Sequence, residues 1–201
     1  MNIEQIKTLK ARWLTPEGVL LRQVVVAELL AHGETWPDLV TQAFGATEAK
    51  PSRMTLDDLR GISLEGLNLA GVDLCYVDLS FASLKGCDLQ GITFQIGRLN
   101  GADLSGSNIL KGDLLQTEAI GANFDHCNLS GAMMMTGSFM GSTFRHADLS
   151  DSVLNGADFT ECMLLATSMK GVECYSTTFP DGFDPLSSGV AAYSPPLGRR
   201  R

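Results

Sequence analysis

The stretch Ala102-Asp103-Leu104-Ser105-Gly106 holds, in a single five-residue unit, the pattern that repeats along most of this chain. A large apolar residue stands at its centre, and such a centre recurs at every fifth position from Leu59 to Phe179. Of the 25 positions in this series, only Ala119 and Cys174 are small. A period of five fits neither the strand period of two nor the helix period of 3.6. The sequence therefore predicts a repeat architecture.

The residues around each centre follow the same phase. The residue two before the centre is mostly small, the residue one before it is often Asp or Asn, and the residue two after it is often Gly. If the chain turns a corner every five residues, the centre and the small residue can both point inward. Large side chains then fill the middle of a shaft and small ones fit its corners. Glycine suits corners that need a positive φ.

This unit, A-(D/N)-L-x-G, resembles the pentapeptide-repeat family over about 120 of the 201 residues. The resemblance implies an all-β solenoid, a right-handed quadrilateral parallel β-helix with four units per coil. Residues 20 apart would stack on one face at roughly 4.8 Å, the usual spacing of hydrogen-bonded strands. Each coil would contact only its neighbours, as in other solenoids.

The ends of such a shaft need caps, because they expose apolar layers and unpaired backbone groups. Residues 1–50 are predicted to form a helical N-terminal cap. Within it, Thr15 reads as an N-cap and Pro16 as the first helical position, and a further short helix is predicted from Pro37 to Phe44.

The rest of the chain divides into three parts. Residues 51–58 are predicted to be a linker, 59–179 the β-helix, and 180–201 a turn and tail in which Phe183 folds over the base of the shaft. The Ser, Gly and Pro content from Ser187 onward predicts a loose tail that ends in Arg199-Arg200-Arg201.

Composition indicates a cytoplasmic protein. No stretch is apolar for long enough to span a membrane, and the N-terminus lacks the apolar segment of a signal peptide. The five cysteines fit a reducing compartment. Cys87, Cys127 and Cys162 fall where small inward residues belong, so we expect buried packing residues rather than disulfides.

The shaft is acidic. Residues 57–179 carry fifteen acidic and six basic residues, a net charge of −9. Such a surface repels nucleic acid, whose binding needs clustered Lys and Arg. One interpretation is a solvated surface that keeps a rod soluble. The other is a rod that imitates DNA and attracts a DNA-binding protein.

Resemblance to the family adds a specific partner to the second interpretation. Some pentapeptide-repeat proteins bind DNA gyrase or topoisomerase IV as DNA mimics and protect it from antibiotics, so the resemblance implies that this chain binds gyrase. The residues predicted to form the acidic binding surface are Asp73, Asp78, Asp88, Asp103, Asp113, Glu118, Asp148 and Asp158.

A second candidate surface is apolar. The position after the centre should be exposed and is usually polar, but several apolar residues occupy it or lie close by. These are Leu110, Leu115, Ile120, Met133, Met135 and Met140. Exposed apolar side chains that cluster indicate an interface, either in a homodimer or with the partner of a scaffold or regulator. Alternatively, the N-terminal helices or the tail fold back over them.

No enzyme site, metal site or cofactor is predicted. His126 and His146 are 20 apart and should stack, with Asp125 and Arg145 beside them, but their next equivalents in the repeat cannot ligate a metal. These four are interpreted as surface residues. The regular Asp/Asn position is interpreted as bonding local backbone at the corners or facing water, not as a catalytic cluster.

Overall fold

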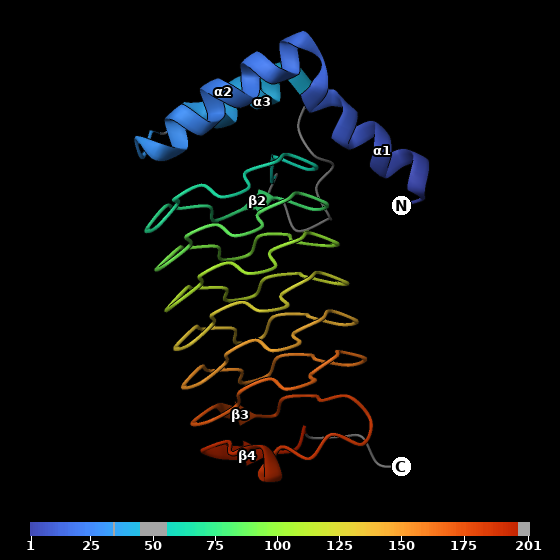
Figure 1. The fold of residues 1–201 in the computed structure, drawn as a ribbon, viewed down its shortest axis with the longest axis vertical. Helices are drawn as coiled ribbons and strands as arrows, with labels where there is room; N and C mark the ends of the chain where they lie inside the picture. Colours follow the sequence, from blue (N-terminus) through green and yellow to red (C-terminus); the bar gives the residue numbers. More distant parts are fainter. Residues whose placement is uncertain (34, 45–55, 197–201) are drawn as a thin grey trace.

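A computed structural model describes residues 1–33, 35–44 and 56–196 as a four-sided shaft with helices across one end (Figure 1). Within these residues, no helix is long and apolar enough to cross a membrane. The helices are α1 (Ile3–Ala11), η1 (Arg12–Leu14), α2 (Pro16–Leu30), α3 (Trp36–Phe44) and η2 (Leu186–Ser188). The strands are β1 (Asp57–Asp58), β2 (Val77–Asp78), β3 (Glu173–Tyr175) and β4 (Ala192–Ser194).

The coils stack in parallel with an offset of twenty residues. β1 pairs with β2, and isolated parallel bridges continue the same offset from Ser63↔Ser83 down to Asp158↔Thr178. Each bridge joins residues that stand one before a centre, so these residues occupy the middle of a face. The stacking of residues 20 apart, predicted from the repeat, is confirmed.

Each corner is a tight turn that follows a centre. At the corner after Leu99, the Ala102 amide donates to the Leu99 carbonyl (2.9 Å), and Gly101 between them has φ 63°. The Asp or Asn before each centre supports such a turn with its side chain. Asp103 Oδ1, for example, accepts from the amide of Ser105, two residues on (3.1 Å). The predicted local role of the Asp/Asn position is therefore confirmed.

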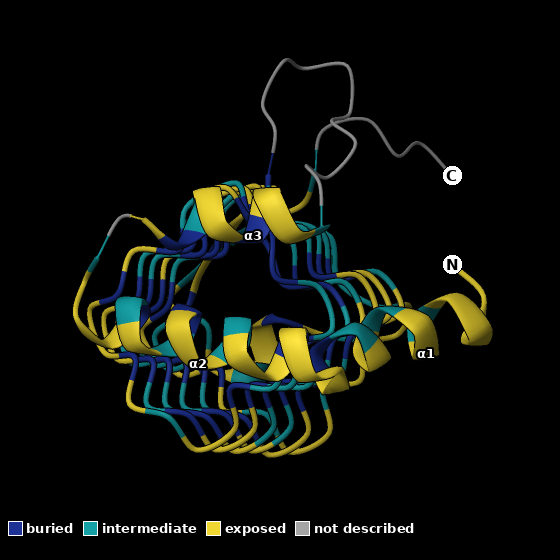
Figure 2. Cartoon of the chain, turned by 90° about the horizontal axis from the view of Figure 1, so that it is seen from above, coloured by how far each residue is buried: buried dark blue, intermediate teal, exposed yellow. Residues whose placement is uncertain are grey.

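Nearly all the centres are buried, and their side chains fill the interior. Figure 2 marks the buried positions along the coils in dark blue. Phe124 and Phe144, one coil apart, stack with ring centroids 4.8 Å apart and an interplanar angle of 6°. Most polar residues at the small inward position have a hydrogen-bond partner in the core, whereas the buried Ser152 Oγ has none among the described residues. Ser107 and Thr117 donate to centre carbonyls of the preceding coil (2.6 and 2.9 Å), as do several of their equivalents. This bond explains why Ser, Thr and Cys fit where Ala is common.

The helical cap closes the first coil. Thr15 accepts from the Gly18 amide (3.0 Å) and Pro16 begins α2, as predicted. The Trp13 indole donates to the Arg60 carbonyl (2.8 Å), and Arg22 Nε donates to the Ser63 carbonyl (2.6 Å). α1 has no buried residue and extends sideways from the shaft (Figure 1).

The shaft begins earlier than predicted. Asp57 and Asp58, assigned to the linker, form β1 and belong to the first coil. Asp58 stands directly before the centre Leu59, so it occupies the same position as the other mid-face residues. Residues 45–55, which include positions 51–55 of the predicted linker, lie outside the described residues.

The far end is more ordered than predicted. Phe183 packs on Phe179 with ring centroids 5.0 Å apart, which confirms the predicted turn over the base. The prediction of a loose tail after Ser187 is wrong for β4, which pairs in parallel with β3 and adds a further rung. Arg199–Arg201 lie outside the described residues.

Corners without glycine allow a direct test of the turn geometry. Gln116 is exposed and has φ 56°, whereas Gly121, at the next corner, has φ 66° and open space where a Cβ atom would stand. A left-handed conformation costs a non-glycine residue roughly 1–2 kcal/mol. We expect Gln116→Gly to stabilise the shaft by about 1 kcal/mol and Gly121→Gln to destabilise it similarly, measured by urea unfolding. Two unchanged unfolding midpoints would contradict these corner conformations.

Candidate interaction surface

Outward side chains stand at two kinds of position: the middle of a face, just before a centre, and the corner that follows the centre. Two adjoining faces with the corners that follow them form what we call the acidic side. Their middle positions run from Asp73 to Glu173 and from Asp78 to Thr178 in steps of twenty. Arg98 is the one basic residue of the acidic side between residues 71 and 179. Its acidic residues are Asp73, Asp78, Asp113, Glu118, Asp158, Glu161 and Glu173.

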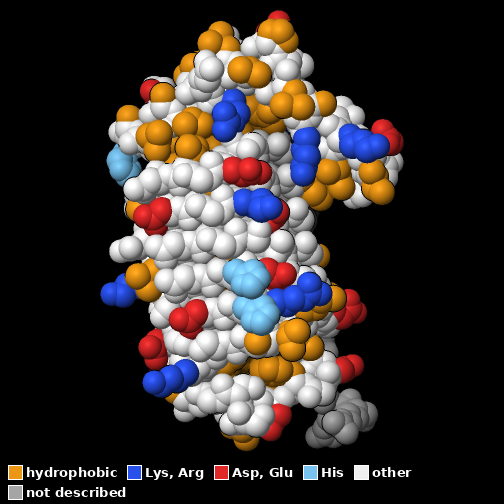
Figure 3. All heavy atoms as spheres, viewed as in Figure 1, with side chains coloured by type: hydrophobic (Ala, Val, Ile, Leu, Met, Phe, Trp, Pro, Cys, Tyr) orange, Lys and Arg blue, Asp and Glu red, His pale blue; other side chains and the backbone are white. Residues whose placement is uncertain are grey.

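The opposite two faces are nearly balanced in charge. Figure 3 shows acidic and basic side chains interspersed on the face that carries the stacked histidines. Lys85 lies 3.9 Å from Asp103, and Arg145 lies 3.8 Å from Asp125. The charged residues of this side are Glu65, Asp88, Asp103, Asp125, Asp148 and Asp151 against Lys85, Lys111, Arg145 and Lys170. The negative charge of the shaft is therefore concentrated on one side.

The predicted acidic residues differ in how far their side chains are exposed to solvent. Asp73 is exposed, and six are half-buried: Asp88, Asp103, Asp113, Glu118, Asp148 and Asp158. The prediction that Asp78 belongs to the acidic binding surface is wrong, because Asp78 is only 3% exposed. Arg98 lies between Asp78 and Glu118, 3.7 Å from a carboxylate oxygen of each, so Asp78 contributes to an internal ion pair rather than to an accessible acidic surface.

The predicted apolar residues are spread around the shaft. Leu110, Leu115 and Ile120 stand at three successive corners, so they do not share one face. Met135 and Met140 lie one coil below Leu115 and Ile120. Ile120 is 44% exposed, whereas Leu110, Leu115 and Met135 are half-buried.

Met133 stands in the middle of a face and is 41% exposed, and Met140 is also exposed. The helices of the N-terminal cap contact the first coil, and the described part of the tail pairs with the last. Among the described residues, therefore, no helix or tail segment covers these middle coils.

The histidine pair stacks as predicted. His126 and His146 lie with ring centroids 5.1 Å apart at an interplanar angle of 7°. The described residues contain no group of three or more His, Cys, Asp or Glu side chains that could hold a metal ion.

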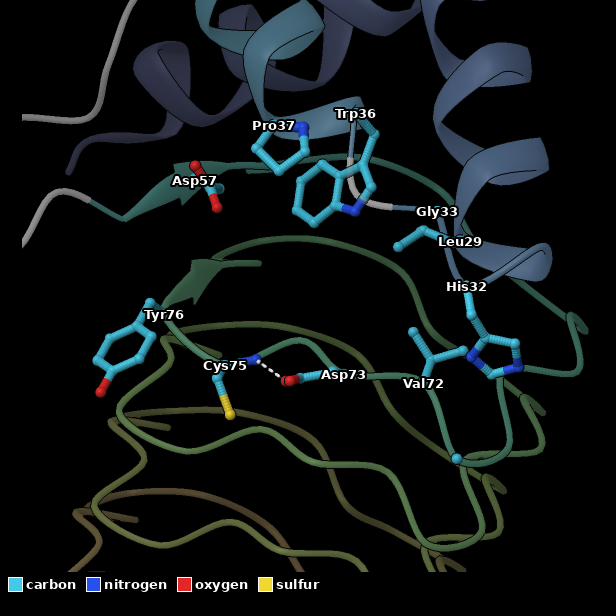
Figure 4. Close-up of a pocket in the computed structure, with 11 residues that line it drawn as sticks. Leu29, His32, Gly33, Trp36, Pro37, Asp57, Val72, Asp73, Cys75 and Tyr76 are labelled. Atoms are coloured by element: carbon cyan, nitrogen blue, oxygen red, sulfur yellow. Dashed lines mark hydrogen bonds between the residues drawn. The ribbon is translucent and has the colours of Figure 1, made fainter.

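A cavity of about 450 Å³ lies where the cap meets the shaft (Figure 4). Trp36 borders it above, while Asp73 and Cys75 border it below, where the Cys75 amide donates to Asp73 Oδ1 (2.9 Å). Burial, together with Asp73, raises the pKa of the Cys75 thiol to about 11. Burial and the nearby Asp38 raise the pKa of Asp57. A raised pKa keeps a thiol in its less reactive protonated form at neutral pH.

The other cysteines are packing residues, as predicted. Burial raises the pKa of Cys127 and Cys162 to about 12, and each Sγ donates to a carbonyl of the preceding coil (2.9 Å). We expect Ellman's reagent to label at most Cys75 slowly in the folded protein, and all five cysteines in 6 M guanidinium. Fast labelling of several thiols under native conditions would contradict the inward placement.

A family model described as pentapeptide repeats matches the chain in 8 copies, over residues 58–91, 98–134 and 138–172. These ranges span more than half of the 201 residues. No curated protein matches the chain.

Several solved structures are similar to parts of the chain. The pentapeptide repeat protein alr5209 from Nostoc Pcc 7120 is 22% identical, covering 62% of this chain and 84% of that one, with a TM-score of 0.31. Full-length QnrB1, a plasmid-mediated fluoroquinolone resistance protein, is 18% identical over 62% and 79%, with a TM-score of 0.36. HetL from Nostoc sp. strain PCC 7120, involved in heterocyst differentiation regulation, is 21% identical over 59% and 69%, with a TM-score of 0.20.

Proposed function

The chain belongs to the pentapeptide repeat family, and from that premise we propose that it is a non-enzymatic protein that acts by presenting its acidic side to a protein partner. The uneven distribution of charge supports this proposal. If the negative charge served only to keep the rod soluble, it could be spread over all four faces. A binding surface instead needs its charged residues on the side that contacts the partner. The partner must be attracted to negative charge, which points to a protein that itself binds DNA.

The specific partner that we propose is DNA gyrase or topoisomerase IV, bound as a mimic of DNA and thereby protected from antibiotics that poison it. Support comes from the acidic side, where carboxylates recur along the shaft from Asp73 to Glu173 with Arg98 as the one base between them. The electrostatic field of a long negative surface resembles that of a nucleic-acid duplex. Electrostatic complementarity between two proteins speeds and orients their association. The proposal requires a cytoplasmic protein.

Two triple variants with equal charge loss test this proposal. Asp73→Asn, Asp113→Asn and Asp158→Asn together remove three of the seven carboxylates of the acidic side. Each Asn keeps the oxygen that accepts from the amide two residues on. The control triple removes three carboxylates from the opposite side with the same turn bonds retained: Asp88→Asn, Asp103→Asn and Asp148→Asn.

In a gyrase supercoiling assay with and without a quinolone, we expect the wild-type protein to inhibit or protect at micromolar concentration. The first triple should weaken this effect at least about tenfold and the control triple much less, because only the first removes charge from the proposed surface. Folded protein without any effect on gyrase would reject the proposal. Equal losses in both triples would reject the assignment to the acidic side.

A further inference from the structure

Along one face of the acidic side, the outward side chains change from acidic to apolar and back to acidic. In four successive coils its middle positions are Asp113, Met133, Val153 and Glu173, each joined to the next by a parallel bridge. Two apolar side chains therefore lie in line between two carboxylates. Met133 is 41% exposed, and Glu173 is also exposed.

The adjoining corner extends this apolar segment. Leu115 and Met135 stand there one above the other, and the Gln116 amide donates to the Met135 carbonyl between the coils (3.0 Å). Both side chains are half-buried. We call these six residues the strip: Asp113, Leu115, Met133, Met135, Val153 and Glu173.

We propose that the strip docks a segment of a protein partner that is apolar in its middle and basic at both ends. This inference rests on the proposed function in that the chain acts by binding a protein, but it does not require the partner to be gyrase. Exposed apolar side chains gain by burial, and methionine adapts its shape to different partners. The carboxylates at the two ends select for cations there.

The spacing of the strip sets the length of the segment. Asp113 and Glu173 are three coils apart, which is roughly 14 Å at the usual strand spacing. An extended chain covers this distance in about four residues. We therefore expect a strand-like segment with basic residues about four positions apart and apolar residues between them.

Electrostatic repulsion disfavours two other occupants of the strip, a second copy of this chain and a nucleic acid. A second copy docked through the same strip would place Asp113 and Glu173 against the same carboxylates of its partner, and like charges across an interface oppose association. Nucleic acid would bring phosphates to the same acids and has no apolar surface suited to Met133 and Val153.

A labelled peptide tests the strip directly. The probe is a fluorescein-tagged five-residue peptide with lysine at both ends and leucine or valine between, and the control probe has glutamate at both ends. Fluorescence anisotropy with the full chain should detect binding of the lysine peptide only. Because Met133 is central, we expect Met133→Ser to weaken binding about tenfold. Asp113→Asn, which keeps its bond to the Leu115 amide, should weaken binding several-fold.

Matched variants on the opposite side serve as controls. Met163 holds the same repeat position and is 49% exposed, so Met163→Ser should leave binding unchanged, as should Asp103→Asn. No binding of the lysine peptide, or equal losses in Met133→Ser and Met163→Ser, would overturn the proposal. A wild-type dimer in analytical ultracentrifugation that Met133→Ser dissociates would assign the strip to a second copy, and would also overturn it.

This test is separable from the gyrase assay. Peptide binding without any effect on gyrase would reject the gyrase proposal and keep the strip. An effect on gyrase without peptide binding would reject the strip and keep the gyrase proposal.

Discussion

Leu114→Asp is expected to abolish the folded shaft. Leu114 is a centre, only 2% exposed, and it lies between the layers of the coils above and below it. An unpaired carboxylate in this interior costs several kcal/mol, and the lost leucine packing adds about 2–5 kcal/mol. Together these approach the whole stability of a typical domain, roughly 5–15 kcal/mol. Circular dichroism and urea unfolding of the purified variant measure the result.

The neighbouring residue provides the control. Leu115 stands at the corner, half-buried, and its side chain is outside the stack of centres. Leu115→Asp should change the free energy of unfolding by no more than about 1 kcal/mol, since substitutions outside the core usually have small effects. A folded Leu114→Asp with the wild-type unfolding midpoint would contradict the inward placement of the centres.

The second large effect is expected at the junction of cap and shaft. Asp58 is only 2% exposed and pairs with two guanidinium groups: Arg12 Nη2 lies 2.7 Å from Oδ1 and Arg60 Nη2 lies 2.9 Å from Oδ2. Asp58→Asn leaves these cations without their counter-charge, and removal of one partner of a buried pair costs about 3–5 kcal/mol. We expect the cap to detach, with a red shift in the fluorescence of Trp13 and Trp36, both of which are buried in the cap.

Asp103→Asn is the matched control for this variant. Its partner Lys85 lies 3.9 Å away on an exposed part of the surface, so the loss of this pair should change stability by less than about 1 kcal/mol. A cap that stays in place in Asp58→Asn, with unchanged tryptophan fluorescence, would contradict the role assigned to the buried pair.

The same junction should be sensitive to acid. Burial by itself raises the pKa of Asp58, but the hydrogen bonds from Arg12 and Arg60 outweigh it and hold the pKa well below 3.8. Because the folded pKa is lower than the unfolded one, the stabilisation is fully present above about pH 4 and is lost as the pH falls from there through the folded pKa. An acid titration followed by Trp fluorescence should show this transition in the wild-type protein and not in Asp58→Asn.

The shaft could be predicted well from the sequence because every five-residue unit has the same pattern and adopts the same geometry. The phase of five assigns each residue to a centre, a small inward position, a face or a corner, and the bridges from Ser63 to Thr178 follow that phase throughout. The phase also places Asp58 on a face, so its place in the first coil could have been found from Leu59 by counting back one residue.

Features outside the repeat could not be predicted in the same way. The contact of Arg12 with Asp58 joins positions 46 residues apart in the sequence, and no periodic pattern connects the cap to the coil. β4 pairs through its backbone, and the Ser, Gly and Pro content from Ser187 onward predicted a loose tail instead. The burial of Asp78 depends on the neighbouring Arg98, and a mid-face position alone does not reveal such a pair.

Cysteine pairs introduced on the outer surface test the coil geometry most directly. Ser130 and Ser150 stand at corner positions one coil apart, where the Gly131 amide donates to the Ser150 carbonyl (2.8 Å). Their α-carbons should lie about one strand spacing apart, within the range of a disulfide. Ser130→Cys with Ser150→Cys should therefore oxidise readily, whereas Ser130→Cys with Asn155→Cys, on the next corner, should not. Disulfide formation only in the second pair, or equally in both, would contradict the four-sided shaft and every surface derived from it.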